Sequence, residues 1–250
     1  MKLLDRPGVS AVVLVAILLG LWQAGFMLAW PDALASPAAT SAWLVQQLSG
    51  PDFWVHVWAT GKAFLVALVI AIAGGLLIGL VTGLSATASE TAEPLLLAAN
   101  SIPKIALYPV VLLLFGIGLP AKIAFGAIHG VIPVAIFTMN ACRAVPPVLT
   151  KTARVLRLSP TDRIGSVFLP AALPDVVTGI RLGFSLTLIG TIHGEMFGSQ
   201  SGLGYLLMTS IGLQNTEVIM AVTVLLIAFA AVVSTALLSW ERSLRRDRGQ

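Results

Sequence analysis

Long runs without a charged residue alternate with short polar segments along the whole chain. Because about 20 apolar residues are needed to cross a bilayer as a helix, each long run is a candidate membrane span. The uncharged runs are Pro7–Pro31, Ala63–Ser89, Ile105–Ala121, Ile123–Ala141 and Val218–Trp240. The pattern predicts six spanning helices, at Val9–Trp30, Ala59–Leu84, Pro94–Leu119, Ala121–Ala141, Val176–Phe197 and Thr216–Trp240.

The third of these helices has two interpretations. Its apolar part, Ile105–Leu119, covers only about 22 Å at ~1.5 Å per residue, whereas the hydrocarbon core is about 30 Å thick. We therefore expect the helix to begin near Pro94 and to carry two prolines and Lys104 inside it. The alternative is a short interfacial helix, Pro94–Ile102, that leads into a half-length span.

Composition favours a membrane protein and excludes a soluble one. Of the 250 residues, 57% are hydrophobic and 10% are charged, whereas soluble globular chains have about 45–50% and about 25%. A soluble fold of this size would lack the polar surface that keeps it dispersed. The single cysteine, Cys142, permits no internal disulfide and no cysteine-rich metal site, and we expect no metal centre.

The basic residues indicate which helix ends face the cytoplasm. Eleven of the fifteen Lys and Arg residues lie before the first predicted helix, between the fourth and fifth, or after the sixth. By the positive-inside rule these segments are cytoplasmic, so we expect an all-α membrane protein with about six spans and both termini inside. The segments assigned to the outside contain no basic residue: Pro31–Trp58, Gly116–Pro120 and Gly198–Asn215.

The first hydrophobic run has a rival interpretation as a signal peptide. Lys2 and Arg6 precede it, and Ala33-Leu34-Ala35 is similar to a cleavage site. The run Val9–Trp30 has 22 residues, against about 7–15 in a signal peptide, which favours a retained helix. We expect the following segment, Pro37–Leu48, to form a short helix on the outer surface.

Only one polar segment is long. Residues 142–175 hold five basic and two acidic side chains and face the cytoplasm in the predicted topology. Within it, Ser159-Pro160-Thr161-Asp162 has the form of a helix start, with Ser159 as the cap. Helical composition over Val148–Leu158 and a stop at Leu169-Pro170 complete a prediction of two short helices joined at a bend. Such a compact segment offers a surface for a partner protein.

Three motifs, in a fixed order, carry a resemblance to a known family. In the polar segment the pattern is Lys151-Thr152-Ala153-x3-Arg157-x9-Val167-Phe168-Leu169-Pro170. The other two are Ile102-Pro103 through Pro109 to Phe115-Gly116-Ile117-Gly118, and Gly194-Glu195-Met196 followed by Ser201-Gly202-Leu203-Gly204-Tyr205. Over roughly residues 59–240 the chain resembles the permease subunits of bacterial ATP-binding-cassette importers, nearest to the nitrate, sulfonate, taurine and bicarbonate group.

The resemblance implies a set of partners. The polar segment would be a coupling helix seated in a groove of a separate ATPase subunit, and the chain itself would not be an enzyme. ATP would bind to that ATPase, so we expect no cofactor here; the chain also lacks the G-x-x-x-x-G-K-[ST] phosphate-binding motif. The other implied partners are a second permease copy, forming a homodimer, an extracytoplasmic solute-binding protein and the lipid bilayer of the bacterial inner membrane. No nucleic acid is expected.

The resemblance also implies a division of the chain and a cargo. Residues 1–58 would form the N-terminal helix and outer segment, 59–240 the permease domain and 241–250 a basic cytoplasmic tail. The cargo would be a small anionic solute, similar to a sulfonate, nitrate or taurine. One alternative is an ion-coupled secondary transporter, which would show inverted internal repeats that we do not find. Another is an intramembrane enzyme, for which no Ser or Cys has a suitably spaced base.

The coupling segment departs from the family pattern at two positions. Lys151 and Arg157 stand where the family has Glu and Gly. A left-handed bend at Arg157 would be strained, so we hypothesise that Ser159-Pro160 supplies the bend instead and that the ATPase groove is unusually acidic. The alternative is that the basic residues only enforce topology. The expected ATPase contacts are Lys151, Ala153, Arg154, Arg157, Ser159, Leu169 and Pro170.

Polar residues inside the predicted spans are candidates for the transport pathway. Lys104, one turn after Asn100, would line a pore that attracts anions, unless the helix starts late and Lys104 reaches the inner headgroups. Glu195 would accept backbone N–H bonds from the loop Gly198–Gly204 and act as an outer gate; its alternative is a solvated helix-end charge. His193 lies about 200° around the helix from Glu195, so the two do not form a metal pair.

Small residues on the second predicted helix favour close helix packing. Gly75, Gly79 and Gly83 continue a four-residue spacing that lets another helix approach closely. The sequence leaves open whether this neighbour belongs to the same chain or to a second copy. His56 and His129 have no partner that the sequence identifies, and we interpret them as interfacial or packing residues.

Overall fold

The structure is a computed structural model, and it describes residues 7–28, 34–159, 162, 165–166 and 169–246. Within these residues there is no β-strand, and the predicted all-α class is confirmed. A short 3₁₀ helix, η1 (Lys104–Leu107), lies in the middle of the chain. The α-helices are α1 (Pro7–Leu28), α2 (Pro37–Leu48), α3 (Pro51–Gly83), α4 (Ala86–Ser101), α5 (Tyr108–Phe115), α6 (Leu119–Arg143), α7 (Pro147–Val155), α9 (Leu169–Gly198), α10 (Leu203–Gly212) and α11 (Thr216–Arg246).

Four of the described helices are long and apolar enough to cross a membrane, namely α3, α6, α9 and α11. The pair formed by α4 and the η1–α5 segment is a fifth span only if the two are taken together, because they are bent by 84°. In α1, the stretch Val12–Leu28 belongs to a shorter apolar class. The sixth span and the cytoplasmic position of both termini therefore stay predictions.

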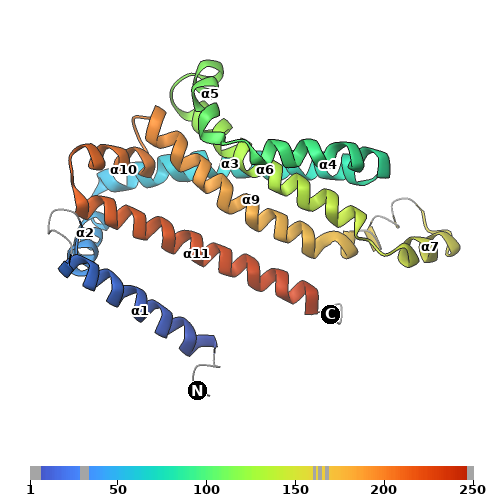
Figure 1. Ribbon diagram of the computed structural model, residues 1–250, viewed down its shortest axis with the longest axis horizontal. Coiled ribbons are helices and arrows are strands. Elements are labelled where there is room, and N and C mark those ends of the chain that lie inside the picture. The colour runs from blue at the N-terminus through green and yellow to red at the C-terminus, as the bar shows by residue number, and fades with distance from the viewer. Residues whose placement is uncertain (1–6, 29–33, 160–161, 163–164, 167–168, 247–250) are drawn as a thin grey trace.

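The centre of the bundle is α6, which packs against α3 and α9 (Figure 1). A Cβ atom at Gly75, Gly79 or Gly83 of α3 would overlap atoms of α6, so these glycines permit the close approach. Their partners on α6 are the side chains of Val134, Thr138 and Cys142. The glycine stripe thus faces a helix of the same chain, which resolves the question that the sequence left open. Glycines of α9 approach α6 in the same way, at Gly179, Gly183 and Gly190.

The prediction of one continuous third helix is wrong. The chain breaks at Ile102, where φ is −64° and ψ is 130°, between the end of α4 and the start of η1. The cause is Pro103, because a proline disfavours helical dihedrals in the residue before it and lacks the N–H that would continue the ladder. Pro109 is tolerated, since it lies in the first turn of α5. The observed arrangement is closer to the alternative of a short helix leading into a half-length span, although α4 already begins at Ala86.

Other helix boundaries also differ from the predictions. We expected Leu169-Pro170 to end a helix, but it begins α9, because the first-turn N–H groups have no intrahelical partner and proline costs nothing there. Likewise α3 begins at Pro51 rather than at Ala59, and α11 continues to Arg246, into the predicted tail. The helix α10 lies in a segment that we interpreted as an outer loop. By contrast, α2 has the predicted bounds, with Ser36 as its cap.

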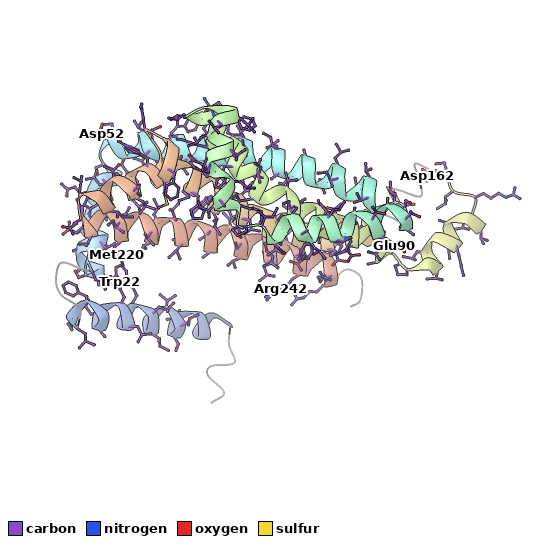
Figure 2. The ribbon with its side chains drawn as sticks, turned by 45° about the horizontal axis from the view of Figure 1, so that its top comes forward. Trp22, Asp52, Glu90, Asp162, Met220 and Arg242 are labelled. Carbon is purple, nitrogen blue, oxygen red and sulfur yellow. The ribbon has the colours of Figure 1, made fainter. Side chains whose placement is uncertain are left out.

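Different helices and termini lie at the two ends of the bundle. In Figure 1, α7 lies at one end and α2 and α10 lie at the other. The start of α1 and the end of α11 both point toward the α7 end. Figure 2 shows Glu90 and Asp162 near that end and Asp52 near the opposite one. We call these the inner and outer ends, following the predicted topology.

The helix α1 stands apart from the bundle (Figure 1). Its side chains from Val12 to Leu21 are exposed. A hydrogen bond from the Trp22 indole Nε1 to the Ala35 carbonyl oxygen, 2.9 Å, fastens its outer end to the residues before α2. Apolar side chains that are exposed on the outside of a helix are suited to contact with the lipid of a bilayer.

Candidate functional site

The carboxylate of Glu195 is the centre of a polar cluster at the outer end of the bundle. Its side chain lies near the end of α9 and is 0% exposed. The Thr60 hydroxyl of α3 donates a hydrogen bond to Oε2 at 2.7 Å, and the backbone N–H of Gly204 donates to the same oxygen at 3.0 Å. The Lys122 ammonium of α6 lies 3.4 Å from Oε1. One carboxylate therefore holds α3, α6, α9 and the start of α10 together.

The loop between α9 and α10 is fixed by the same residues. Lys122 Nζ donates to the Ser201 carbonyl oxygen at 2.6 Å, and the Leu203 N–H donates to Thr60 Oγ1 at 2.7 Å. The Gly202 N–H donates to His56 Nδ1 at 3.1 Å. His56, for which the sequence gave no partner, is thus part of the cluster. We call Thr60, Lys122, Glu195 and the segment Ser201–Gly204 the outer clamp.

Gly202 is required by the geometry of the outer clamp. Its φ is +119°, which side-chain-bearing residues rarely adopt. A Cβ atom there would overlap the Glu195 carboxylate. Glycine therefore allows the loop to turn and its backbone to approach the carboxylate at the same place.

A tyrosine connects the broken third span to the outer clamp. The Tyr108 hydroxyl, in the first turn of α5, donates to the Gly194 carbonyl oxygen at 2.8 Å, one residue before Glu195. Its ring also packs edge-on against Phe125 of α6, with centroids 4.9 Å apart. The position of α5 is thereby tied to the helix that carries Glu195.

The structure confirms the predicted contact between Glu195 and the Gly-rich loop, and the alternative of a solvated helix-end charge is wrong. The gate role itself stays a prediction. Sequence reasoning missed Lys122 and Thr60. The sequence did contain a signal that Lys122 has a partner, because Lys122 is the one charged residue between two long uncharged runs. It also lies near the outer end of a predicted helix, at the same depth in the membrane as Glu195 in the predicted topology. A cation in a span needs a partner, and Glu195 was an available one.

Lys104 and Asn100 lie at the bend and are not brought to the outer clamp. Lys104 belongs to η1, and its Nζ donates to the Asn100 carbonyl oxygen at 3.1 Å. The Asn100 side chain is exposed. The placement of Lys104 inside a continuous helix is therefore wrong, and its role in attracting anions stays a prediction.

The coupling segment contains one well-defined helix, α7, at the inner end (Figure 1). On it Lys151 is exposed and Ala153 is buried. The side chains of Arg154 and Leu169 lie outside the described part, as do Pro160, Thr161, Val167 and Phe168. Pro170 is exposed in the first turn of α9.

The bend after α7 is made by Arg157. Its φ is +50°, and the N–H of Leu158 donates to the Ala153 carbonyl oxygen at 3.1 Å. This is the hydrogen bond of a Schellman cap, in which the left-handed residue is usually glycine. The hypothesis that Ser159-Pro160 replaces the bend at Arg157 is therefore wrong. Ser159 does cap the next turn, since its Oγ accepts the Asp162 N–H at 3.1 Å.

A second charged cluster joins α9 to α11 at the inner end. Arg245 Nη2 lies 2.9 Å from Asp175 Oδ1 and 3.3 Å from Glu241 Oε1. Arg181 Nε lies 3.3 Å from Glu241 Oε2. We call these four residues the inner ion cluster. Asp175, near the start of α9, is the last residue of the coupling segment 142–175.

Comparison with known proteins identifies the class. The apolar spanning helices define a multi-pass membrane protein. The family model of the binding-protein-dependent transport system inner membrane component matches residues 71–248, and the chain belongs to that family. It is therefore a permease, located in the inner membrane, of an ATP-binding-cassette importer, and not an enzyme.

Several relatives match nearly the whole chain. The putative aliphatic sulfonates transport permease protein SsuC of Bacillus subtilis is 27% identical over 94% of this chain and 88% of its own length. The riboflavin transport system permease protein RibX of Chloroflexus aurantiacus is 30% identical over 96% and 92%. The taurine transport system permease protein TauC of Escherichia coli is 26% identical over 99% and 92%.

The fold has a counterpart among solved structures. A chain from the inward-facing MetNI methionine ABC transporter superposes with a TM-score of 0.67 at 23% sequence identity. The match covers 78% of this chain and 98% of that one. At this identity the likeness shows the shared fold only.

Proposed function

We propose that this chain forms one half of the pathway for a small anionic solute, closed on its outer side by the outer clamp and moved from its inner side by α7. A separate ATPase would bind α7, a second copy of the chain would complete the pathway, and a solute-binding protein would deliver the solute to the outer end. The outer end faces away from the cytoplasm in this arrangement. The division into residues 1–58, 59–240 and 241–250 is part of the proposal.

The observation that carries the proposal is the fully buried Glu195 carboxylate. It connects three spanning helices and the loop at one end, while α7 protrudes at the other end (Figure 1). A permease of this kind needs an outer closure that opens when the binding protein delivers the solute. A buried carboxylate with charged and backbone donors is such a closure, because its contacts are strong when dry and weaken when water enters.

The anionic cargo is supported by relatives whose names refer to aliphatic sulfonates, taurine and nitrate. Another relative is named for riboflavin, so the family as a whole does not share one solute. The cargo therefore has to be tested on this chain.

The proposal is tested by reconstituting the chain with its ATPase and binding protein in vesicles. We expect ATP-dependent uptake of an alkanesulfonate, and we expect Glu195→Gln to raise ATP hydrolysis in the absence of binding protein, because the outer clamp opens without its signal. Glu217→Gln is the matched control, since Glu217 is an exposed acid in the first turn of α11. A wild-type complex that hydrolyses ATP without moving any alkanesulfonate would contradict the anionic cargo.

The role of α7 needs a separate experiment. Charge reversal at Lys151, which is exposed on α7, should reduce the amount of ATPase retained during purification in detergent. The control is Arg242→Glu, an exposed basic residue at the inner end but on α11. Equal retention by both variants would show that the ATPase does not bind through α7.

A further inference from the structure

Lys62 of α3 is a cation inside a spanning helix, and it has no partner among the described residues. Most basic residues lie in the segments that we predict to face the cytoplasm. Three of the others have contacts: Lys104 with Asn100, Lys122 with Glu195, and Arg181 with Glu241. Lys62 of α3 remains. Its side chain is exposed, and it makes no hydrogen bond or ion pair with any residue that the structure describes. A cation toward the outer end of a span is also unexpected from the positive-inside rule.

Lys62 lines a cavity of about 720 Å³ at the outer end of the bundle. The cavity lies beside the outer clamp, because Lys122 and Ser201 also contribute to its wall. Its volume is in the range of sites that hold small molecules, about 300–1,000 Å³. The space is therefore large enough for a solute, and it borders the outer clamp.

The polar part of this wall offers hydrogen-bond donors and positive charge. Besides Lys62, the Gln200 amide and the Ser201 hydroxyl have no side-chain partner among the described residues. None of the described residues that line the cavity is an Asp or a Glu. The Lys122 charge is shared with Glu195, which lies behind it, so Lys62 supplies the uncompensated charge. Such a set of donors recognises an oxyanion.

The rest of the wall is apolar. Val55 and Trp58 come from the two turns of α3 before Lys62, Ile117 comes from the segment between α5 and α6, and Leu119 is the first residue of α6. Trp58 is 72% exposed, so its ring is available for contact. A ligand with one negative group and a short apolar part would contact both the polar and the apolar residues of the cavity wall. An inorganic anion would contact only the polar residues.

We propose that this cavity is the entry subsite for the transported solute, and that it binds a small organic oxyanion, such as an alkanesulfonate, with the negative group on Lys62 and the apolar part against Trp58. The assignment rests on the proposed import of an anion. It places the first anion contact at the outer end of α3 rather than at Lys104. The other source of an oxyanion at this depth is the phosphate of a lipid headgroup, and the experiment separates the two.

The first experiment measures protection of Lys62 in the assembled transporter, held in nanodiscs of phosphatidylcholine. A membrane-impermeant acylating reagent modifies Lys62, and mass spectrometry gives the rate with and without sodium butanesulfonate. At a probe concentration ten times its dissociation constant, mass action predicts about tenfold slower acylation of Lys62. Lys151, exposed on α7 at the other end, is the reference in the same molecule and should react at an unchanged rate.

Two comparisons decide the chemistry of the ligand. Neutral butanesulfonamide should not protect Lys62, and nitrate should protect it more weakly than butanesulfonate does. Equal protection by the sulfonamide, or none by the sulfonate, would overturn the proposal. If butanesulfonate has no effect but replacing phosphatidylcholine by phosphatidylglycerol, whose headgroup has a net negative charge, protects Lys62, the cavity binds an anionic lipid headgroup and the proposal is wrong.

A transport measurement gives an independent result. Lys62→Gln should raise the KM for butanesulfonate uptake about tenfold or more with little change in kcat, because it removes one charge-assisted contact. Lys62→Arg should restore it, and Asp52→Asn, an exposed change at the same end, should have no effect. If butanesulfonate protects Lys62 from acylation but is not transported, the binding subsite is supported and the proposed import of an anion is wrong. If butanesulfonate is transported equally by the wild type and by Lys62→Gln, and does not protect Lys62, the proposed import is supported and the subsite is wrong.

Discussion

The two ends of α9 hold charged side chains in opposite ways. At the outer end, the paired side chains of Lys122 and Glu195 are 4% and 0% exposed. At the inner end, the side chains of Arg245 and Asp175 are 42% and 41% exposed, although their atoms lie closer together. Burial therefore separates these two pairs more than distance does, although Glu241 of the inner ion cluster is only 7% exposed. Removing one member of a buried ion pair lowers the stability of the protein strongly, because the other charge stays buried without a partner. In an exposed ion pair, water takes the place of the lost partner, so the loss of stability is small.

This difference fits two tasks in one permease. In the proposed function, the outer clamp stays closed until the solute is delivered, and the contacts of Glu195 are few and buried. The inner ion cluster includes Asp175, the last residue of the coupling segment, and in the proposed function it adjusts as that segment moves. We expect substitutions to show the contrast in size and in salt dependence.

The largest effect is expected from breaking the buried pair. Lys122→Met leaves the Glu195 carboxylate buried without its cation, which costs about 3–5 kcal/mol and should lower the melting temperature in detergent strongly. The double variant Lys122→Met with Glu195→Leu removes both charges and should recover part of the loss, because the Thr60 hydroxyl and the Gly204 N–H still lose their acceptor. If the double variant is no more stable than the single one, the pair is not the source of the effect.

A somewhat smaller effect is expected at the glycine of the outer clamp. Gly202→Ala adds a Cβ that overlaps the Glu195 carboxylate and places it at a φ of +119°. Overpacking and left-handed strain together cost about 2–4 kcal/mol. The melting temperature should fall, and uptake should be lost because the loop shifts. Gly212→Ala is the control, since a Cβ there meets no atom within 4 Å.

The inner ion cluster should respond weakly. Asp175→Asn removes one exposed pair with Arg245, which keeps its contact with Glu241. The expected loss is about 0.2–1 kcal/mol, decreasing as salt is raised. Melting temperatures measured at low and high salt check this. A loss as large as that of Lys122→Met, or one that salt does not change, would contradict the contrast between the ends.

The smallest effect is expected at the bend after α7, and it is stabilising. Arg157→Gly relieves left-handed strain of about 1–2 kcal/mol and adds about 0.5–1 kcal/mol of backbone entropy cost. The net gain should slow hydrogen exchange at the Leu158 amide about two- to fivefold. Arg157→Ala keeps the strain and should leave exchange unchanged. Faster exchange in Arg157→Gly would show that the Arg157 side chain itself stabilises the cap.

The sequence predicted what depends on local pattern. The uncharged runs located α3, α6 and α11, Ser159 marked a helix start, and the motif around Glu195 indicated its contact with the loop. It did not predict pairs that form across the fold. Lys122 and Glu195 are 73 residues apart, and Arg245 and Asp175 are 70 apart, so no helical spacing connects them. The helix boundaries at Pro51, Ile102 and Leu169 depend on which backbone N–H and carbonyl groups near the prolines find hydrogen-bond partners. Composition does not reveal these partners.

The glycines between α3, α6 and α9 have a mechanical consequence. They bring the three helices so close that a slide or twist of one against another would drive side chains into backbone. We therefore expect this trio to travel as a single block during the transport cycle. The pathway would then widen and narrow at the seam with the second subunit, by the tilting of whole blocks, while only the short segments at the rim rearrange internally.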